Sequence, residues 1–145
     1  MSSITVLFSN KSFASTEVDS HQVQKNDAIT LKQAIDAYAD LDYQKAYQLF
    51  VPLAKSGNVY AQFGLAQLYE QGLHGSENAF KAFYWYQKAA NQEYGIAQNH
   101  LGVMHEEGRA VVTNLDTAKY WFTLACENRC TLGCKNLERI EALLN

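Results

Sequence analysis

Residues 61–72 read AQFGLAQLYEQG, and residues 97–108 read AQNHLGVMHEEG. The two stretches lie 36 residues apart and place Ala, Leu and Gly at matching positions. The same offset continues in the segments that follow, where it pairs Ala82 with Ala118, Trp85 with Trp121 and Ala89 with Ala125. Self-similarity at a fixed period of this length is the sequence signature of a repeat array, so the offset determines the expected architecture.

Within each unit the apolar residues recur three and four residues apart, which predicts two amphipathic helices per unit. Small residues on these helices let them approach closely, and Trp85 and Trp121 are expected to fill the core between them. Helices are predicted near residues 31–39, 42–56, 59–71, 78–92, 95–107, 115–128 and 131–144. The expected fold is an all-α superhelix over residues 27–145, with repeats at 28–57, 58–93 and 94–129 and a capping helix at 131–144.

Helix starts and stops agree with this division. Asp42, Asn58, Asn78 and Asn114 can each cap the helix that follows, and Gly57 can end a helix. Thr30 with Gln33 forms a capping-box pattern, which predicts a helix start there. Pro52, inside the second predicted helix, should cost a hydrogen bond and bend that helix.

Composition narrows the function classes. The chain has 145 residues, 48% apolar and 19% charged, with a single proline and a net charge of −3, which favours a packed helical domain over disorder. No window of eighteen apolar residues predicts a membrane span, and no cluster of Lys and Arg predicts nucleic-acid binding. The apolar run Ile4–Phe8 has no basic residue before it and is too short for a secretory signal, so we expect a cytoplasmic protein. A periplasmic or secreted location is the alternative if a signal peptide has been removed.

The segments AQFGLAQLYEQG, KAFYWYQKAA and AQNHLGVMHEEGRAVVTNLDTAKYWFTLAC resemble Sel1-like repeats, which are relatives of the tetratricopeptide repeat. Residues 37–57 are similar to the shorter unit that opens such arrays, and the resemblance covers about residues 28–138. It implies a solenoid that binds proteins. Departures from the pattern are His105 in place of Tyr, Glu93 and Arg129 in place of the inter-repeat Gly, and Ala110 in the loop. These departures concern local turn geometry and leave the superhelix intact.

Residues 1–26 lie outside the repeat pattern and are rich in Ser, Thr, Asn and Gln. We expect them to form a partly ordered polar arm. Val6, Leu7, Phe8 and Phe13 are the residues of this arm that can dock on the first helix pair.

Catalytic and metal-binding motifs are weak. His100 and His105 are five residues apart and lie on different sides of a helix, whereas helical ligand pairs are usually four apart, so no metal is expected. Glu106 and Glu107 are adjacent and point apart, which is typical of a solvated face and not of an acid/base pair. No cofactor motif is present in the sequence. A non-catalytic protein is therefore expected, with a hydrolase as the minority alternative.

Cys126 and Cys134 are eight residues apart and flank the turn before the last helix, where two thiols can meet. ACENRCTLGCKNL also resembles the cysteine-rich secreted branch of the repeat family, in which such a pair bridges adjacent helices and some members are described as penicillin-binding or β-lactamase-like. The favoured interpretation is that Cys126 is a small buried residue with a free thiol, in keeping with a reducing cytoplasm. Cys130 is unpaired under either interpretation.

In a curved helix-pair array the first helix of each pair lines the inner face, so its residues outside the packing stripe are the expected partner contacts. These residues are Tyr60, Phe63, Gln67, Glu70, Gln71, Ile96, Asn99, Val103, Glu106 and Glu107. For Phe63 and Val103 the equal alternative is packing between units. Phe80 and Phe83 are a second candidate, because the next repeat has Asp116 and Lys119 there. They either cover the N-terminal arm or form an exposed patch.

The preferred function is a protein-binding module that recognises one partner on its concave face. Small proteins of the resembled family act as immunity or inhibitor proteins for bacterial toxins, and an acidic inner row would suit a basic toxin domain. A general adaptor or regulator is one alternative. The other is an exported cysteine-rich protein that acts on a β-lactam or binds a cell-wall peptide.

Overall fold

The computed structural model describes residues 20–145, and the expected docking of Val6, Leu7, Phe8 and Phe13 lies outside this range. Over the described residues the chain forms seven helices and no strand. They are α1 (Ser20–Ala39), α2 (Tyr43–Lys55), α3 (Val59–Gln71), α4 (Ala79–Ala90), α5 (Gly95–Glu107), α6 (Leu115–Glu127) and α7 (Thr131–Leu144). The all-α prediction is confirmed.

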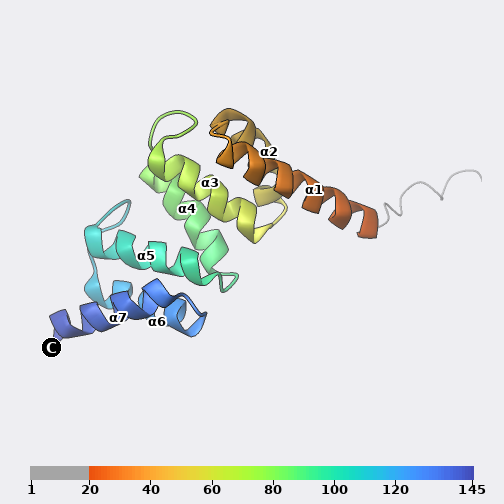
Figure 1. Ribbon diagram of the computed structural model, residues 1–145. Helices are drawn as coiled ribbons and strands as arrows, with labels where there is room; N and C mark the ends of the chain where they lie inside the picture. The colour runs from red at the N-terminus through yellow and green to blue at the C-terminus, as the bar shows by residue number, and fades with distance from the viewer. Residues whose placement is uncertain (1–19) are drawn as a thin grey trace, which may run out of the picture.

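The helices stack in chain order as antiparallel pairs (Figure 1). Helix α1 pairs with α2, α3 with α4, and α5 with α6, while α7 packs on α6 and on α5. Each pair also contacts the next, through α2 with α3 and α4 with α5. The array is therefore a superhelix in which each unit is covered by its neighbour.

Side-chain caps set where the helices begin. The backbone N–H of Lys45 donates to Asp42 Oδ1 at 3.1 Å, and Asn58, Asn78 and Asn114 cap α3, α4 and α6 in the same way. Gly72 and Gly108 end α3 and α5 in the left-handed conformation that glycine adopts without penalty, with φ of 62° and 70°.

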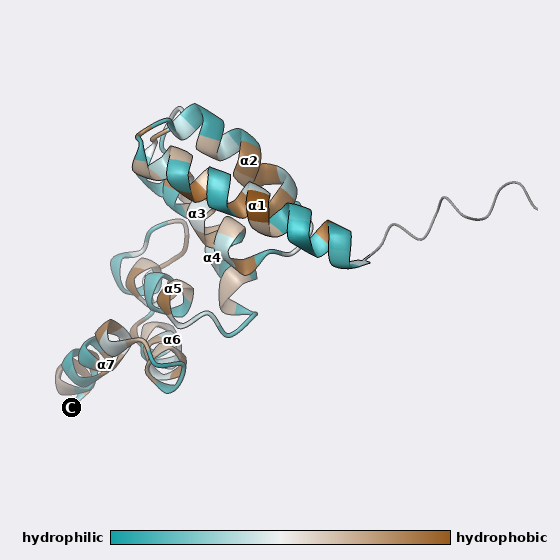
Figure 2. Ribbon diagram, turned by 45° about the vertical axis from the view of Figure 1, so that its right-hand side comes forward, coloured by the Kyte–Doolittle hydropathy of each residue, from teal (hydrophilic) through white to brown (hydrophobic). Residues whose placement is uncertain are grey.

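Helix α1 begins at Ser20, eleven residues before the predicted start. The Thr30–Gln33 capping box is wrong: Thr30 lies inside α1, and its hydroxyl donates to the carbonyl of Asn26 at 2.9 Å. No Gly or Pro interrupts residues 20–39, so nothing stops the helix from extending toward the N-terminus. Residues 20–26, assigned to the polar arm, are thus helical, and the first turns of α1 are mainly hydrophilic (Figure 2).

The core is built from alanine on facing helices with a few large side chains between them. Tyr86 and Phe122 have no exposed surface and are the largest fully buried residues. Phe122 fits because it faces Gly102, where an added Cβ would overlap the Phe122 ring. Trp85 and Trp121, expected to be the core fillers, are half-buried and pack against the edge of the core.

The repeat junctions share a polar connection. Gln62 donates its side-chain amide to the carbonyl of Ala54 at 3.1 Å, and Gln98 repeats the contact with Ala90 at 3.2 Å.

The turns keep the geometry of the repeat even where glycine is missing. Glu93, Arg129 and Ala110 adopt φ values of 62°, 64° and 61°. Each costs about 1 kcal/mol relative to glycine, which the surrounding packing offsets.

None of the helices among residues 20–145 is both long enough and apolar enough to cross a lipid bilayer.

Candidate functional site

An apolar groove lies between α1 and α3, with a volume of about 210 Å³. Helix α2 contributes its floor, and the turn before α5 contributes its border. The lining residues are Ile35, Tyr38, Phe50, Tyr60, Phe63, Gly64, Gln67 and Tyr94. Three of them, Tyr60, Phe63 and Gln67, belong to the predicted inner row, so the structure brings part of that row into one hollow.

Gly64 and Phe50 form the floor of the groove. A Cβ added at Gly64 would lie 2.7 Å from the ring of Phe50, which is buried beneath it. Any side chain at position 64 would therefore occupy the groove or displace the Phe50 ring. The Phe50 ring fills the space that a side chain at position 64 would need, so Gly64 and Phe50 together close the floor of the groove.

Ring contacts hold the wall beside this floor. Tyr94 meets Phe63 edge to face at 5.3 Å between centroids and meets Tyr60 at 5.7 Å. Phe63 also contacts Tyr86 and His100. Burial, with smaller contributions from Tyr60 and Cys130, raises the pKa of Tyr94 above 10, so its hydroxyl is protonated at neutral pH. The groove is therefore a pre-formed apolar hollow whose rim can still donate hydrogen bonds.

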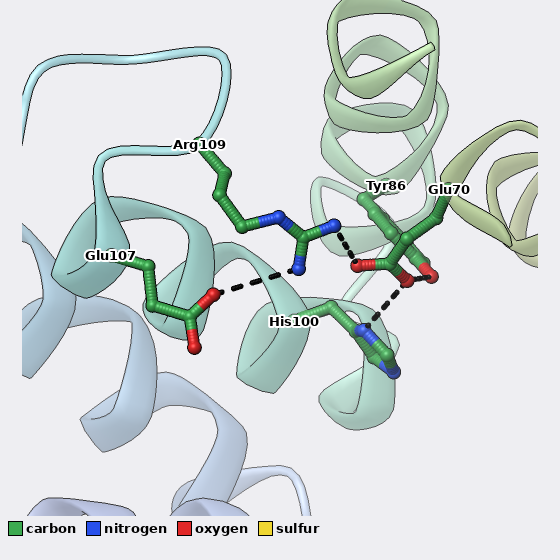
Figure 3. Close-up of polar contacts among 5 residues, drawn as sticks. All are labelled: Glu70, Tyr86, His100, Glu107 and Arg109. Carbon is green, nitrogen blue, oxygen red and sulfur yellow. Dashed lines mark hydrogen bonds and ion pairs between the residues drawn. The ribbon is translucent and has the colours of Figure 1, made fainter. Parts of the chain in front are cut away.

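A half-buried carboxylate, Glu70, lies against Tyr86 and His100, the two residues that Phe63 also contacts (Figure 3). Glu70 accepts a hydrogen bond from the Tyr86 hydroxyl at 2.5 Å, and its oxygens lie 2.9 Å from Arg109 Nη2 and 3.5 Å from His100 Nδ1. Arg109 also contacts Glu107 at 3.5 Å. The cluster joins α3, α4, α5 and the loop after α5.

Electrostatics in this cluster favour the ionised carboxylate. Burial alone would raise the pKa of Glu70, but hydrogen bonds from His100 and Tyr86, together with the charges of His100 and Arg109, lower it to about 2. Burial and the bond to Glu70 raise the pKa of Tyr86 far above its ordinary value. Glu70 is therefore a structural anion, satisfied by the chain itself.

The other acidic residues of the predicted row are also paired. Arg139 of α7 forms a two-pronged contact with Glu106, with N–O distances of 2.5 and 2.7 Å. This bond and the charge of Arg139 hold the pKa of Glu106 below its usual value, although burial opposes them. The sequence-based picture of a free acidic row is wrong, because Arg109 pairs with both Glu70 and Glu107, and Arg139 pairs with Glu106.

The remaining residues of the row separate by burial. Asn99 is buried and accepts a hydrogen bond from Asn136 at 2.8 Å, and Val103 packs against the core around Phe122. Both are packing residues, so their assignment as surface contacts is corrected. Gln71 and Ile96 are exposed.

The second candidate patch also divides. Phe80 is 74% exposed and lies in a shallow hollow with Val112, which is 89% exposed. Phe83 packs against the core and meets the ring of His105 edge to face at 5.7 Å. Phe83 is thus a packing residue, and only Phe80 is available on the surface.

Cys126 and Cys134 form a disulfide that links α6 to α7, with their Cα atoms 4.5 Å apart. The favoured interpretation of free thiols is therefore wrong. The tight packing of α7 on α6 explains the pairing, because Gly133 lies against Ala125 so closely that an added Cβ would be 2.5 Å from the Ala125 side chain. Cys130 is a free thiol, as predicted.

Sequence analysis missed five groove residues and the donors to Glu70. Ile35 and Tyr38 lie on the first predicted helix, from which no contact residue was chosen, while Phe50 lies on the second helix and Tyr94 in the turn before α5. One signal was present: the 36-residue offset aligns Gly64 with His100 and Phe50 with Tyr86, so the later repeat has a large side chain where the groove has a glycine.

A family model described as Sel1 repeat matches residues 37–58, 59–94 and 95–130. Among solved structures, the chain is similar to c5321, a protective antigen of uropathogenic Escherichia coli strains displaying an SLR fold. That match has 26% identity and a TM-score of 0.77, and covers 86% of this chain and 27% of that one. A Sel1 repeat protein from Oxalobacter formigenes matches with 28% identity and a TM-score of 0.73, over 84% of this chain and 50% of that one.

Helicobacter pylori cysteine rich protein B shares the fold, with 21% identity and a TM-score of 0.64 over 79% of this chain and 97% of that one. No curated protein sequence matches the chain. The chain spans about a quarter of the length of the Escherichia coli protein and half of the length of the Oxalobacter formigenes protein.

Proposed function

The chain belongs to the Sel1 repeat family, whose members generally mediate protein–protein interactions, and on this premise we propose that its groove binds an apolar side chain of a protein partner. The fold is typically a non-catalytic interaction module. One observation carries the proposal: the groove is a hollow of about 210 Å³ that is lined mainly by aromatic side chains. An apolar anchor that enters a pre-formed hollow gains contact area while the protein loses little freedom.

The rim supplies orientation. Tyr38, Gln67 and Tyr94 line the mostly apolar hollow, and their polar groups can bond to the backbone on either side of the anchor. The apolar anchor then supplies most of the affinity, and the polar groups of the rim set the orientation of the bound segment.

This mode of binding serves an inhibitor of a bacterial toxin and a general adaptor equally well. The charge of the inner row does not favour a basic toxin domain, because Arg109 and Arg139 already pair with Glu70, Glu106 and Glu107. We therefore expect the groove to select its partner by an apolar residue and not by a basic surface. No observation on residues 20–145 favours the hydrolase alternative.

Peptide selection tests the groove. A displayed random peptide library, selected on the purified protein, should yield peptides that share one large apolar residue. Tyr60 is 55% exposed and Ile35 is 50% exposed, so Tyr60→Ala and Ile35→Asp should leave the fold intact and weaken those peptides at least tenfold. Tyr84 is 50% exposed outside the groove, which makes Tyr84→Ala the matched control. Equal binding to Ile35→Asp and to the control would refute the proposal.

We further propose that the protein works in an oxidising compartment, such as the periplasm or the exterior of the cell, and not in the cytoplasm. The Cys126–Cys134 disulfide supports this location, since such bonds are rare in reducing compartments. Alkylation of the protein in lysates of its native host, before and after reduction, tests the proposal. One reactive thiol before reduction and three afterwards are expected, and three before reduction would contradict it.

A further inference from the structure

A second hollow, of about 330 Å³, lies between the C-terminal end of α4 and helix α6. It shares no residue with the groove, and most of its surface is polar. Its lining residues are Ala90, Asn91, Glu93, Gln98, Tyr120, Trp121, Leu124, Glu127 and Asn128. Each has a counterpart 36 residues earlier in the sequence, among residues 54–92. We call that region the earlier junction and compare the hollow with it.

The comparison explains why this junction has room. At the earlier junction Gln92 reaches across and donates both to Gln62 Oε1 at 2.8 Å and to the carbonyl of Gly57 at 3.0 Å. Its counterpart Asn128 is one methylene shorter and donates to Gln98 Oε1 at 2.9 Å. The shorter side chain therefore leaves space where glutamine fills it.

The charges of the two junctions are opposite. The earlier junction carries two lysines, Lys55 and Lys88, at the positions that Asn91 and Leu124 occupy in the hollow. The hollow instead carries two glutamates: Glu93 replaces Gly57, and Glu127 replaces Asn91. No lysine or arginine lines the hollow. Over residues 20–145 no salt bridge engages Glu93 or Glu127.

An aromatic ring recurs at both junctions, but its cation does not. The ammonium of Lys88 lies over the ring of Tyr84, 5.4 Å from the centroid. At the later junction the ring is Tyr120, which is 57% exposed, and Leu124 stands in place of the lysine. The ring that holds an internal ammonium in one repeat is thus without one in the next, beside two carboxylates.

We propose that this hollow binds the ammonium or guanidinium group of a lysine or arginine side chain from a protein partner. Two carboxylates attract the cation, and the rings of Tyr120 and Trp121 add their electron-rich faces. The hollow opens at the surface through exposed Glu93, Tyr120 and Glu127, so a side chain can enter while its backbone stays outside. The site is a second contact point, separate from the groove.

Titrations monitored by nuclear magnetic resonance test this site on the whole chain. The probes are n-butylammonium and N-acetyl-lysine methylamide, with 1-butanol as the uncharged control, at constant ionic strength. Both cations should shift the Trp121 indole N–H and the Asn128 amide saturably, and 1-butanol should not. Glu93→Gln with Glu127→Gln should weaken both cations roughly tenfold, as expected for the loss of two solvent-screened attractions.

Two variants serve as controls. Glu138→Gln removes an exposed glutamate outside the hollow and should leave binding unchanged. Ile35→Asp alters the groove and should also leave it unchanged. Equal shifts with 1-butanol, undiminished binding by the double variant, or the absence of saturable shifts would overturn the proposal. Binding of n-butylammonium without N-acetyl-lysine methylamide would also overturn it, in favour of a free small amine.

Discussion

The imidazole of His100 stacks on the ring of Tyr86, with 4.5 Å between centroids and 15° between planes. One repeat earlier the equivalent positions are Gly64 and Phe50, where the aromatic ring packs against the glycine and both residues line the groove. The same place in the repeat is thus an open groove at one junction and a closed, hydrogen-bonded cluster at the next. In the closed cluster His100 contacts Glu70. We therefore assign partner binding to the first junction and stabilisation of the array to the second.

Glu70→Gln should destabilise the protein at neutral pH. Because the pKa of folded Glu70 is lowered to about 2 from 4.5, its ionised form stabilises the fold above about pH 4.5, and this contribution is lost as the pH falls toward 2. The shift corresponds to about 3.5 kcal/mol at roughly 1.4 kcal/mol per pKa unit, and solvent screening of this half-buried carboxylate reduces the expected loss at pH 7 to about 2–3 kcal/mol. Urea unfolding of both proteins across pH 2–7 measures the difference, which should shrink with acid. A constant difference would show that the charge of Glu70 contributes nothing.

Gly102→Ala should destabilise the array although alanine favours helices. A Cβ at Gly102 would overlap the Phe122 ring, which is fully buried and has no room to move. Overpacking of this kind costs about 1–3 kcal/mol. Gly75 has nothing within 4 Å of an added Cβ, so Gly75→Ala is the matched control and should change stability by less than about 0.5 kcal/mol. Similar unfolding curves for the two variants would show that α5 and α6 are not in close contact at Gly102.

The repeat offset alone predicts most of the fold. It places α3 at residues 59–71, where the structure has Val59–Gln71, because Asn58 and Gly72 mark both ends chemically. It fails at α1, where no such signal exists and the helix simply continues. It also assigns Trp85 to the core centre, whereas Tyr86 lies four residues from Ala82 on the buried face and takes that place.

The site is less predictable because its contacts are long-range. Arg109 reaches Glu70 only through the path of the loop that follows α5, and Arg139 reaches Glu106 only because α7 packs back on α5. Neither pairing follows from helix periodicity. Residue size is more informative, since the repeat offset aligns Gly64, which lines the groove, with the much larger His100.

Reduction of the Cys126–Cys134 bond should lower stability without unfolding the array. The bond closes a short loop of eight residues in sequence separation, and loops of this size contribute about 2–3 kcal/mol by restricting the unfolded chain. The double variant Cys126→Ala with Cys134→Ala should unfold at the same temperature with and without reductant. The wild-type melting temperature should fall to that level only when reductant is present. A wild-type melting temperature that is the same with and without reductant would contradict the role of this bond in stability.

His105→Phe should reduce the loss of stability that accompanies mild acid. Burial lowers the pKa of His105 below 6.5, and its Nδ1 has no hydrogen-bond partner, so the fold favours the neutral ring. Above about pH 6.5 His105 is neutral in both the folded and the unfolded chain. Below that pH the imidazole is protonated in the unfolded chain while it stays neutral in the folded chain, so the stability of the fold decreases.

A six-membered ring suits this position. At the equivalent place one repeat earlier, Tyr69 meets Tyr47 edge to face at 6.0 Å, much as His105 meets Phe83 at 5.7 Å. Chemical unfolding at pH 7.5 and pH 5 compares the two proteins, and the stability lost between these values should be smaller in the variant. Part of the loss should persist, because burial and nearby Lys81 also lower the pKa of His74, against the opposing backbone hydrogen bond at Leu68. An unchanged loss would mean that His105 accepts its proton in the folded state as readily as in the unfolded chain.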